Sequence, residues 1–145
     1  MDKNSFLWKM VDGRLPLSPC DKTLGFEFVQ IDGKRGTVEI KFEAKPEFLN
    51  PAGNVQGGFL AAMLDDTMGP AVFVMTEGKL YTATITMTVN FLAPAKPGKL
   101  IGEATVTQLG KTVAFVEGRL MAEDGRLLAT ASSSARLVET AKAIR

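Results

Sequence analysis

The sequence predicts a single α+β domain in which an antiparallel sheet wraps around one long, apolar helix. A stretch from about residue 57 to 75 is apolar on nearly every side, as expected of a buried helix. Strand patterns precede and follow this stretch, and tight turns join the later ones, which favours antiparallel pairing. The chain has 145 residues, a length that suits one domain with a core of its own, so we assign residues 1–145 to it.

The first twenty residues are predicted to form a short helix and a connector. Residues 4–12 place their apolar side chains on one face of a helix, and Gly13 follows as a natural stop. Prolines at positions 16 and 19 favour an irregular connector. Two strands are then expected at 24–31 and 37–43, where apolar residues alternate with others.

The central helix is expected from about Gly57 to Met75. Pro70 lies inside it and cannot donate to the carbonyl of Asp66, so we expect a kink or a local opening there. An unbroken alternation over 81–91 predicts a long strand after the helix. Its apolar face would cover the helix, and Thr84, on the other face, would point away. Further strands fit 99–109, 112–122 and 126–137.

Composition excludes several classes of function. The net charge is +1 and the basic residues are scattered, so nothing resembles a nucleic-acid-binding face. The single cysteine, Cys20, cannot form an internal disulfide, and no apolar signal region stands at the start; both favour a cytoplasmic setting. We read no apolar run as long enough to span a membrane. The chain has no histidine, so we expect neither a metal site nor a redox cofactor.

Two glycines at the start of the predicted helix are candidate functional residues. The first amides of a helix have no partner within it, and Gly57-Gly58 would let a substrate approach them closely. Such amides can form an oxyanion hole, which stabilises negative charge developing on a carbonyl oxygen. Alternatively, the glycines only ease a tight entry into the helix.

Two adjacent acids, Asp65 and Asp66, stand in the same apolar helix. A buried carboxylate is costly unless it is held or used, so each is either catalytic or structural. Gly57 and Asp65 are eight positions apart, which is about 12 Å along a helix. They cannot reach one substrate within one chain. If both are catalytic, each works with its counterpart from a second copy in a symmetric dimer.

These positions, together with Asn50, Gly53 and the ending Phe91–Lys96 of the long strand, resemble the hotdog-fold acyl-CoA thioesterases, nearest the PaaI-like branch of the phenylacetate pathway. The resemblance covers about residues 24–137. It implies a sheet that continues across a dimer, or a dimer of dimers, and an acyl-CoA substrate.

By position, the resemblance also implies roles for residues. Asp65 would act as nucleophile or general base, the amide of Gly57 would polarise the thioester carbonyl, and Asn50 and Thr84 would assist. Gly58 and Asp66 are included as candidate substrate-binding residues. The phosphates of CoA would need cations at the mouth of the site, for which Lys96 and Lys111 are candidates.

One departure from the family pattern concerns Gln56. The family usually has histidine before the two glycines, whereas glutamine can donate a hydrogen bond but carries no proton at neutral pH. We retain Gln56 among the site residues as an orienting group. The substitution leaves open a non-catalytic acyl-CoA-binding protein on the same fold. A hotdog dehydratase ranks last because it would need an active-site histidine.

Overall fold

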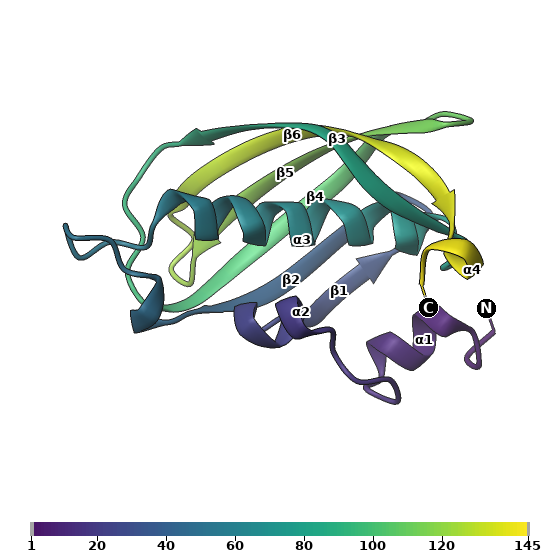
Figure 1. Cartoon of the computed structure of the whole chain (residues 1–145), viewed down its shortest axis with the longest axis horizontal. Coiled ribbons are helices and arrows are strands. Elements are labelled where there is room, and N and C mark those ends of the chain that lie inside the picture. Colours follow the sequence, from purple (N-terminus) through teal and green to yellow (C-terminus); the bar gives the residue numbers. More distant parts are fainter. Residues whose placement is uncertain (1, 145) are drawn as a thin grey trace.

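The computed structural model describes residues 2–144, which form one curved sheet around a central helix (Figure 1). Six strands pair antiparallel in the order β1-β2-β4-β5-β6-β3. The strands are β1 (Glu27–Asp32), β2 (Thr37–Ala44), β3 (Leu80–Phe91), β4 (Gly98–Leu109), β5 (Val113–Ala122) and β6 (Leu127–Glu139). The helices are α1 (Phe6–Val11), α2 (Pro19–Leu24), the 3-10 turn η1 (Pro46–Phe48), α3 (Gly57–Met75) and α4 (Thr140–Ala143). The predicted α+β hotdog architecture is confirmed.

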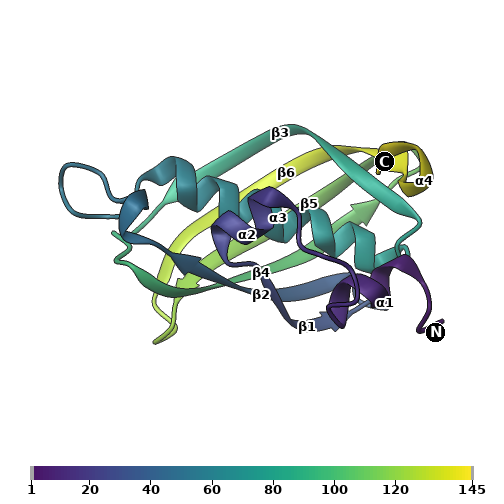
Figure 2. The same cartoon turned by 60° about the horizontal axis from the view of Figure 1, so that its bottom comes forward.

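Helix α3 lies along the concave side of the sheet and supplies much of the core (Figure 2). Glycines on the middle strands allow this close approach. A Cβ added at Gly102 would overlap the Thr67 hydroxyl, and one added at Gly118 would lie 2.9 Å from Cγ of Met68. Thr67 is fully buried, and its hydroxyl donates to the carbonyl of Met63 at 2.7 Å, so the helix satisfies this polar group internally.

The central helix keeps the predicted limits and runs as one helix through Pro70 (Figure 1). No opening interrupts the helix at Pro70, contrary to one of the two expected outcomes. The helix is also long and apolar enough to cross a membrane, contrary to our interpretation of the sequence. Half of its apolar window is buried within the domain, as is usual for the core helix of a folded protein.

The connector contains a helix that the sequence analysis missed. Ser18 caps α2 through its side chain, Pro19 occupies the first turn, and Gly25 ends the helix in the left-handed conformation with φ of 68°. The first strand therefore begins at Glu27 rather than at residue 24. Helix α2 lies across α3 on the side that the sheet leaves open (Figure 2).

A β-bulge corrects our assignment of faces on the long strand. Thr84 pairs with Ala135 and Thr86 with Ser134, so Ile85 is an extra residue without a partner in the ladder. Because one extra residue exchanges the two faces, Thr84 points toward α3 on one side of the bulge and Met87 packs against the core on the other. The expectation that Thr84 points away from the helix is wrong.

Candidate active site

The start of helix α3 presents two backbone amides without acceptors. Gln56 is the N-cap residue, and its carbonyl accepts from the amides of Phe59 and Leu60. Among residues 2–144, the amides of Gly57 and Gly58 donate to no backbone or side-chain acceptor. These two N–H groups are oriented as the first amides of a helix are, with the positive end of the helix dipole behind them. They can therefore stabilise a negatively charged oxygen.

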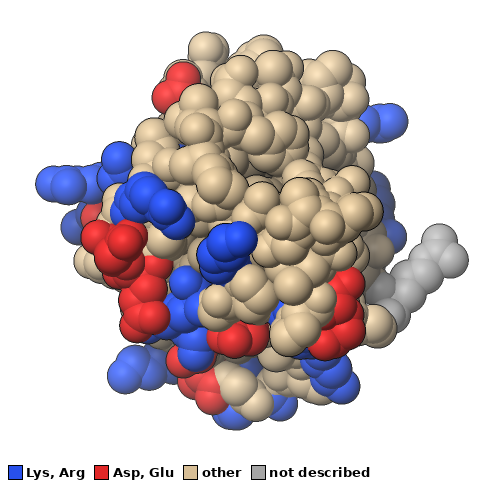
Figure 3. Space-filling view, turned by 90° about the vertical axis from the view of Figure 1, so that its left-hand side faces the viewer, with Lys and Arg blue, Asp and Glu red and all other residues tan. Residues whose placement is uncertain are grey.

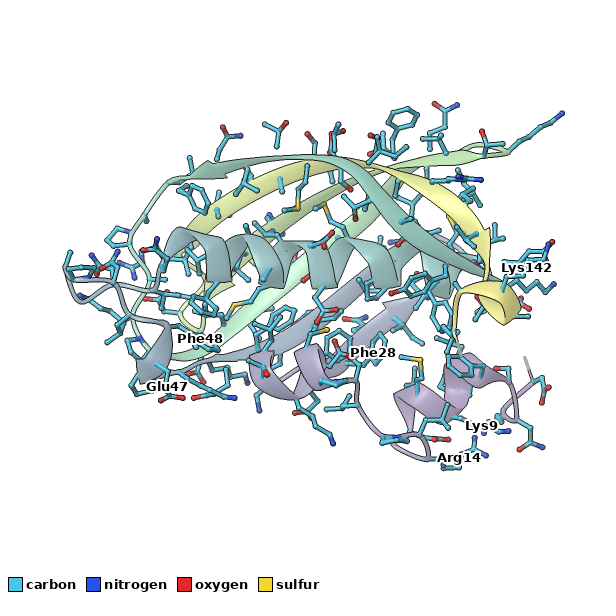
Figure 4. The ribbon with its side chains drawn as sticks, viewed as in Figure 1. Lys9, Arg14, Phe28, Glu47, Phe48 and Lys142 are labelled. Atoms are coloured by element: carbon cyan, nitrogen blue, oxygen red, sulfur yellow. The ribbon has the colours of Figure 1, made fainter. Side chains whose placement is uncertain are left out.

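A hollow of about 390 Å³ lies beside this helix start. Its lining comes from the loop before α3, the first turns of α3 and the segment that follows β3. Members of the lining include Asn50, Asn54, Gly57, Leu60 and Phe91. Figure 3 views this end of the molecule, where uncharged surface fills the upper part and charged side chains gather below and to the left. Phe48 lies below the helix start and stacks on Phe59, with ring centroids 4.1 Å apart (Figure 4).

Asn50 shapes the loop that borders this hollow. Its Oδ1 accepts from the amides of Ala52 at 3.0 Å and Asn54 at 3.1 Å, which fixes the turn. Its side-chain nitrogen has no acceptor in the described part of the chain, so that N–H group is available to a ligand. The structure thus places Asn50 beside Gly57, while its catalytic role stays a prediction.

Gln56 and Gly58 are both exposed next to these amides. The Gln56 side chain makes no capping hydrogen bond to the helix. It remains free to orient a bound group, and its role stays a prediction. A Cβ added at Gly58 would meet nothing within 4 Å, so this glycine is not required by packing within the chain.

Asp65 is exposed in the single chain, and Thr84 holds its carboxylate. The Thr84 hydroxyl donates to Oδ1 of Asp65 at 2.9 Å, across from β3 to α3. The bulge at Ile85 makes this contact possible because it turns Thr84 toward the helix. The hydrogen bond leaves Oδ2 of Asp65 free to accept a proton or attack a carbonyl carbon.

Asp66 is the more buried acid and faces helix α2. Burial, a hydrogen bond with Asp21 and the charges of Asp21 and Asp65 together raise the pKa of Asp66 to about 9. The carboxyl group is therefore protonated at neutral pH, while its Oδ2 is buried without a hydrogen-bond partner. Burial, with nearby Cys20 and the same acids, also raises the pKa of Tyr81.

Ligand atoms of Cys20, Asp21 and Asp66 lie within 4.8 Å of one another, so they are the described side chains best placed to hold a cation. A protonated Asp66 is a poor metal ligand, since coordination requires the carboxylate. None of the three lines the hollow at the start of α3. The substrate-binding role expected for Asp66 stays a prediction.

A larger hollow, of about 490 Å³, lies on the outer face of the sheet. Its lining is mostly hydroxyl and charged side chains of β3 to β6, including Asn90, Glu103, Arg119 and Ser132. The Arg119–Glu103 ion pair occupies part of it. Because this hollow is lined by strand residues and borders no helix start with acceptor-free amides, we place the active site at the start of α3.

The structure thus forms two half-sites in one chain. The first joins Asn50, Gly57 and the neighbouring Gln56 and Gly58, and the second joins Asp65 with Thr84. About 12 Å of helix separates Gly57 from Asp65, so they do not meet within the chain. Sequence reasoning missed Phe91 in the first half-site.

Comparison with known proteins identifies the class. A family model described as the thioesterase superfamily matches residues 52–129. A Saccharolobus solfataricus protein, named for an inferred esterase activity, is 30% identical over 119 residues, covering 82% of this chain and 83% of the relative. The chain therefore belongs to the thioesterase superfamily.

Solved structures indicate the branch. The phenylacetic acid degradation-related protein of Ralstonia eutropha JMP134, described as an inferred thioesterase, is 36% identical with a TM-score of 0.85, covering 91% of this chain and 99% of that one. The E. coli PaaI protein of the phenylacetic acid degradation operon shares the fold at 20% identity, with a TM-score of 0.79 and coverage of 91% and 93%. This chain is a PaaI-like hotdog thioesterase, as its sequence indicates.

Proposed function

We propose that the protein hydrolyses acyl-CoA thioesters to a carboxylic acid and free CoA at a site shared by two copies of the chain. The observation that carries the proposal is the pair of half-sites on α3. Acceptor-free amides at Gly57 and Gly58 border a hollow, and a carboxylate held by Thr84 stands eight positions later. Each half-site lacks what the other provides.

In the proposed reaction, the amide of Gly57 donates to the thioester carbonyl oxygen and stabilises the negative charge that develops there. Asp65 of the second copy either attacks the carbonyl carbon or takes a proton from a water molecule that attacks it. The bond between carbon and sulfur then breaks, and the sulfur leaves as a thiolate that takes up a proton. The side-chain nitrogen of Asn50 is placed to orient the attacking group.

The edge of the sheet supports a dimer. Strand β3 is a twelve-residue edge strand whose outer backbone groups have no partner strand among residues 2–144. Such an edge readily pairs with a second copy. Four large apolar side chains on or just after this strand are also exposed, namely Tyr81, Ile85, Phe91 and Leu92. Pairing along β3 would cover part of this apolar surface and bring the two copies of α3 together.

Two cations at the hollow favour CoA over a thiol without phosphates. Lys96 donates to the carbonyl of Gly53 at 3.2 Å, and Arg126 donates to the carbonyl of Pro94 at 3.5 Å, which fixes both beside the loops that frame the hollow. Neither forms an ion pair among the described residues. Lys111, the other sequence candidate, lies in the β4–β5 turn. It is about 40 Å along β4 from Gly98, the first residue of that strand and two positions after Lys96.

A solved structure with the same fold also bears on this choice. The smu.793 protein of Streptococcus mutans UA159 was solved bound to acetyl CoA, and it is 19% identical to this chain with a TM-score of 0.68. The structural match covers 79% of this chain and 89% of the smu.793 chain. This fold therefore accepts a CoA thioester in at least one protein, which supports the proposal for the present chain.

The test is thiol release from acyl-CoAs with aromatic, short and long acyl groups. Asp65→Asn keeps the shape of the side chain but removes its basicity, so we expect nearly all turnover to disappear. Thr84→Val should lower kcat by about 10- to 150-fold, because a hydrogen bond to a charged group contributes about 1.5–3 kcal/mol. Undiminished turnover by Asp65→Asn would refute the proposed chemistry.

Two comparisons separate the finer alternatives. Hydrolysis of N-acetylcysteamine thioesters, which lack phosphates, should be insensitive to Lys96→Gln, whereas KM for acyl-CoA should rise. Lys34→Gln, at the exposed β1–β2 turn, is the matched control. Tight acyl-CoA binding without thiol release would instead identify a non-catalytic binding protein, consistent with Gln56 in place of the family histidine.

A further inference from the structure

The aromatic ring of Phe91 borders the amide on which the proposed reaction depends. A Cβ added at Gly57 would lie 3.2 Å from Cζ, 3.3 Å from Cε1 and 3.6 Å from Cε2 of Phe91. The outer edge of the ring therefore faces the backbone of Gly57. Phe91 also lines the hollow together with Leu60 and Asn50.

Core packing does not account for this position. Phe91 is 54% exposed, so much of its apolar surface remains in contact with water in the single chain. The bulge at Ile85 directs Met87, Val89 and Phe91 toward the helix, and the first two pack against the core while Phe91 reaches the hollow. Large apolar side chains at the wall of a pocket commonly determine which ligands fit.

We propose that Phe91 sets the acyl-group selectivity of the enzyme by excluding bulk next to the thioester carbonyl. This inference rests on the function proposed above. It assigns the substrate class as acyl groups that are unbranched at the carbon beside the carbonyl.

The argument follows from the size of the reacting group. A carbonyl oxygen held by the Gly57 amide lies about 3 Å from the nitrogen, and the first carbon of the acyl chain is one bond beyond the carbonyl carbon. The ring of Phe91 borders this same volume, because it lines the same hollow as Gly57 and its edge comes closer than ordinary van der Waals contact to the Cβ position of Gly57. An acyl group with a CH₂ as its first carbon can pass along the ring, whereas a second substituent on that carbon would collide with it.

Substrate pairs measure this effect directly. For butyryl-CoA and isobutyryl-CoA, the ratio of the two kcat/KM values cancels any general loss of activity. Phe91→Ala should shift this ratio toward isobutyryl-CoA by about tenfold, since one methyl group in a pocket changes selectivity by about 10- to 200-fold. Phe91→Leu should give an intermediate shift, and Phe91→Trp should shift the ratio the other way.

Phe115 offers a matched control. It is 48% exposed and lies on β5 between the inward-facing Ala114 and Val116, so its ring is on the outer face of the sheet. Phe115→Ala removes a similar apolar surface without touching the hollow, and the ratio should not change. A Phe91→Ala ratio within twofold of the parent, with both substrates slowed equally, would show a structural role only and overturn the proposal.

Failure of the proposed function would be visible separately. If the parent releases no thiol from any acyl-CoA, hydrolysis is refuted, and selectivity can still be read from binding. Dissociation constants for the butyryl and isobutyryl thioether analogues of CoA, which cannot be hydrolysed, should then show the same shift in Phe91→Ala. Equal ratios in parent and variant would refute the role of Phe91 in either case.

Discussion

Replacing Gly57 by proline tests the role of a single backbone hydrogen. Proline has no N–H group, so Gly57→Pro deletes the proposed oxyanion donor while adding no charge. The first position of a helix is where proline is best tolerated. Gln56 already has φ of −58° and ψ of 136°, the extended conformation that a residue before proline requires. We therefore expect the variant to fold.

The expected loss of activity can be separated from the effect of added bulk. Any side chain at position 57 approaches the Phe91 ring at 3.2–3.6 Å, so Gly57→Ala and Gly57→Pro share this contact. Only the proline variant lacks the amide hydrogen. Loss of one oxyanion donor costs about 100- to 1,000-fold in kcat, or roughly 2.7–4 kcal/mol. We expect Gly57→Pro to fall below Gly57→Ala by this factor.

The assay is thiol release at saturating acyl-CoA, accompanied by thermal unfolding of each variant. A comparable melting temperature for the two variants confirms that folding is not the cause. A kcat for Gly57→Pro within threefold of Gly57→Ala would refute the assignment of this amide as the oxyanion donor.

Further predictions concern stability. Gly58→Ala should raise the free energy of unfolding by about 0.5–1 kcal/mol, since the added Cβ meets nothing within 4 Å and alanine favours the helix. Gly102→Ala should lower the free energy of unfolding by about 1–3 kcal/mol because the methyl group would overlap the Thr67 hydroxyl. Unchanged urea midpoints would contradict the predictions for Gly58→Ala and Gly102→Ala. Burial and the neighbouring acids together raise the pKa of Asp66 to about 9, so the folded protein keeps a proton that the unfolded chain releases above about pH 4, and stability should fall as pH rises from about 4 to 9. In urea unfolding measured at a series of pH values, Asp66→Asn should lose this fall of the free energy of unfolding with pH, whereas exposed Asp124→Asn should keep it. The same pH dependence in the parent and both variants would exclude Asp66 as its source.

The limits of α3 and the succession of the main strands and the central helix along the chain were predictable from the sequence. Glycines at 57 and 58 and the apolar run to Met75 mark the helix, and the turns at 110 and 125 separate the later strands. Helix α2 could also have been found, because Ser18-Pro19 at its start and Gly25 after its end are ordinary signals.

The bulge at Ile85 was not predictable. Threonine alternates without interruption through this strand, so its pattern gives no sign of an extra residue, and only pairing with β6 reveals it. This error reversed the expected direction of Thr84. Likewise, the contact between Asp21 and Asp66 depends on how α2 crosses α3, which is tertiary packing that neither local pattern contains.

Mixed dimers test the central claim most directly, namely that one copy supplies the amide and the other the acid. Asp65→Asn and Gly57→Pro chains are each expected to be nearly inactive alone. When the two are coexpressed, about half of the dimers contain one chain of each kind, and each such dimer holds one site with both groups intact. The account predicts recovery of about a quarter of the parent activity. A mixture no more active than its separate components, in a preparation shown to contain mixed dimers, would contradict it.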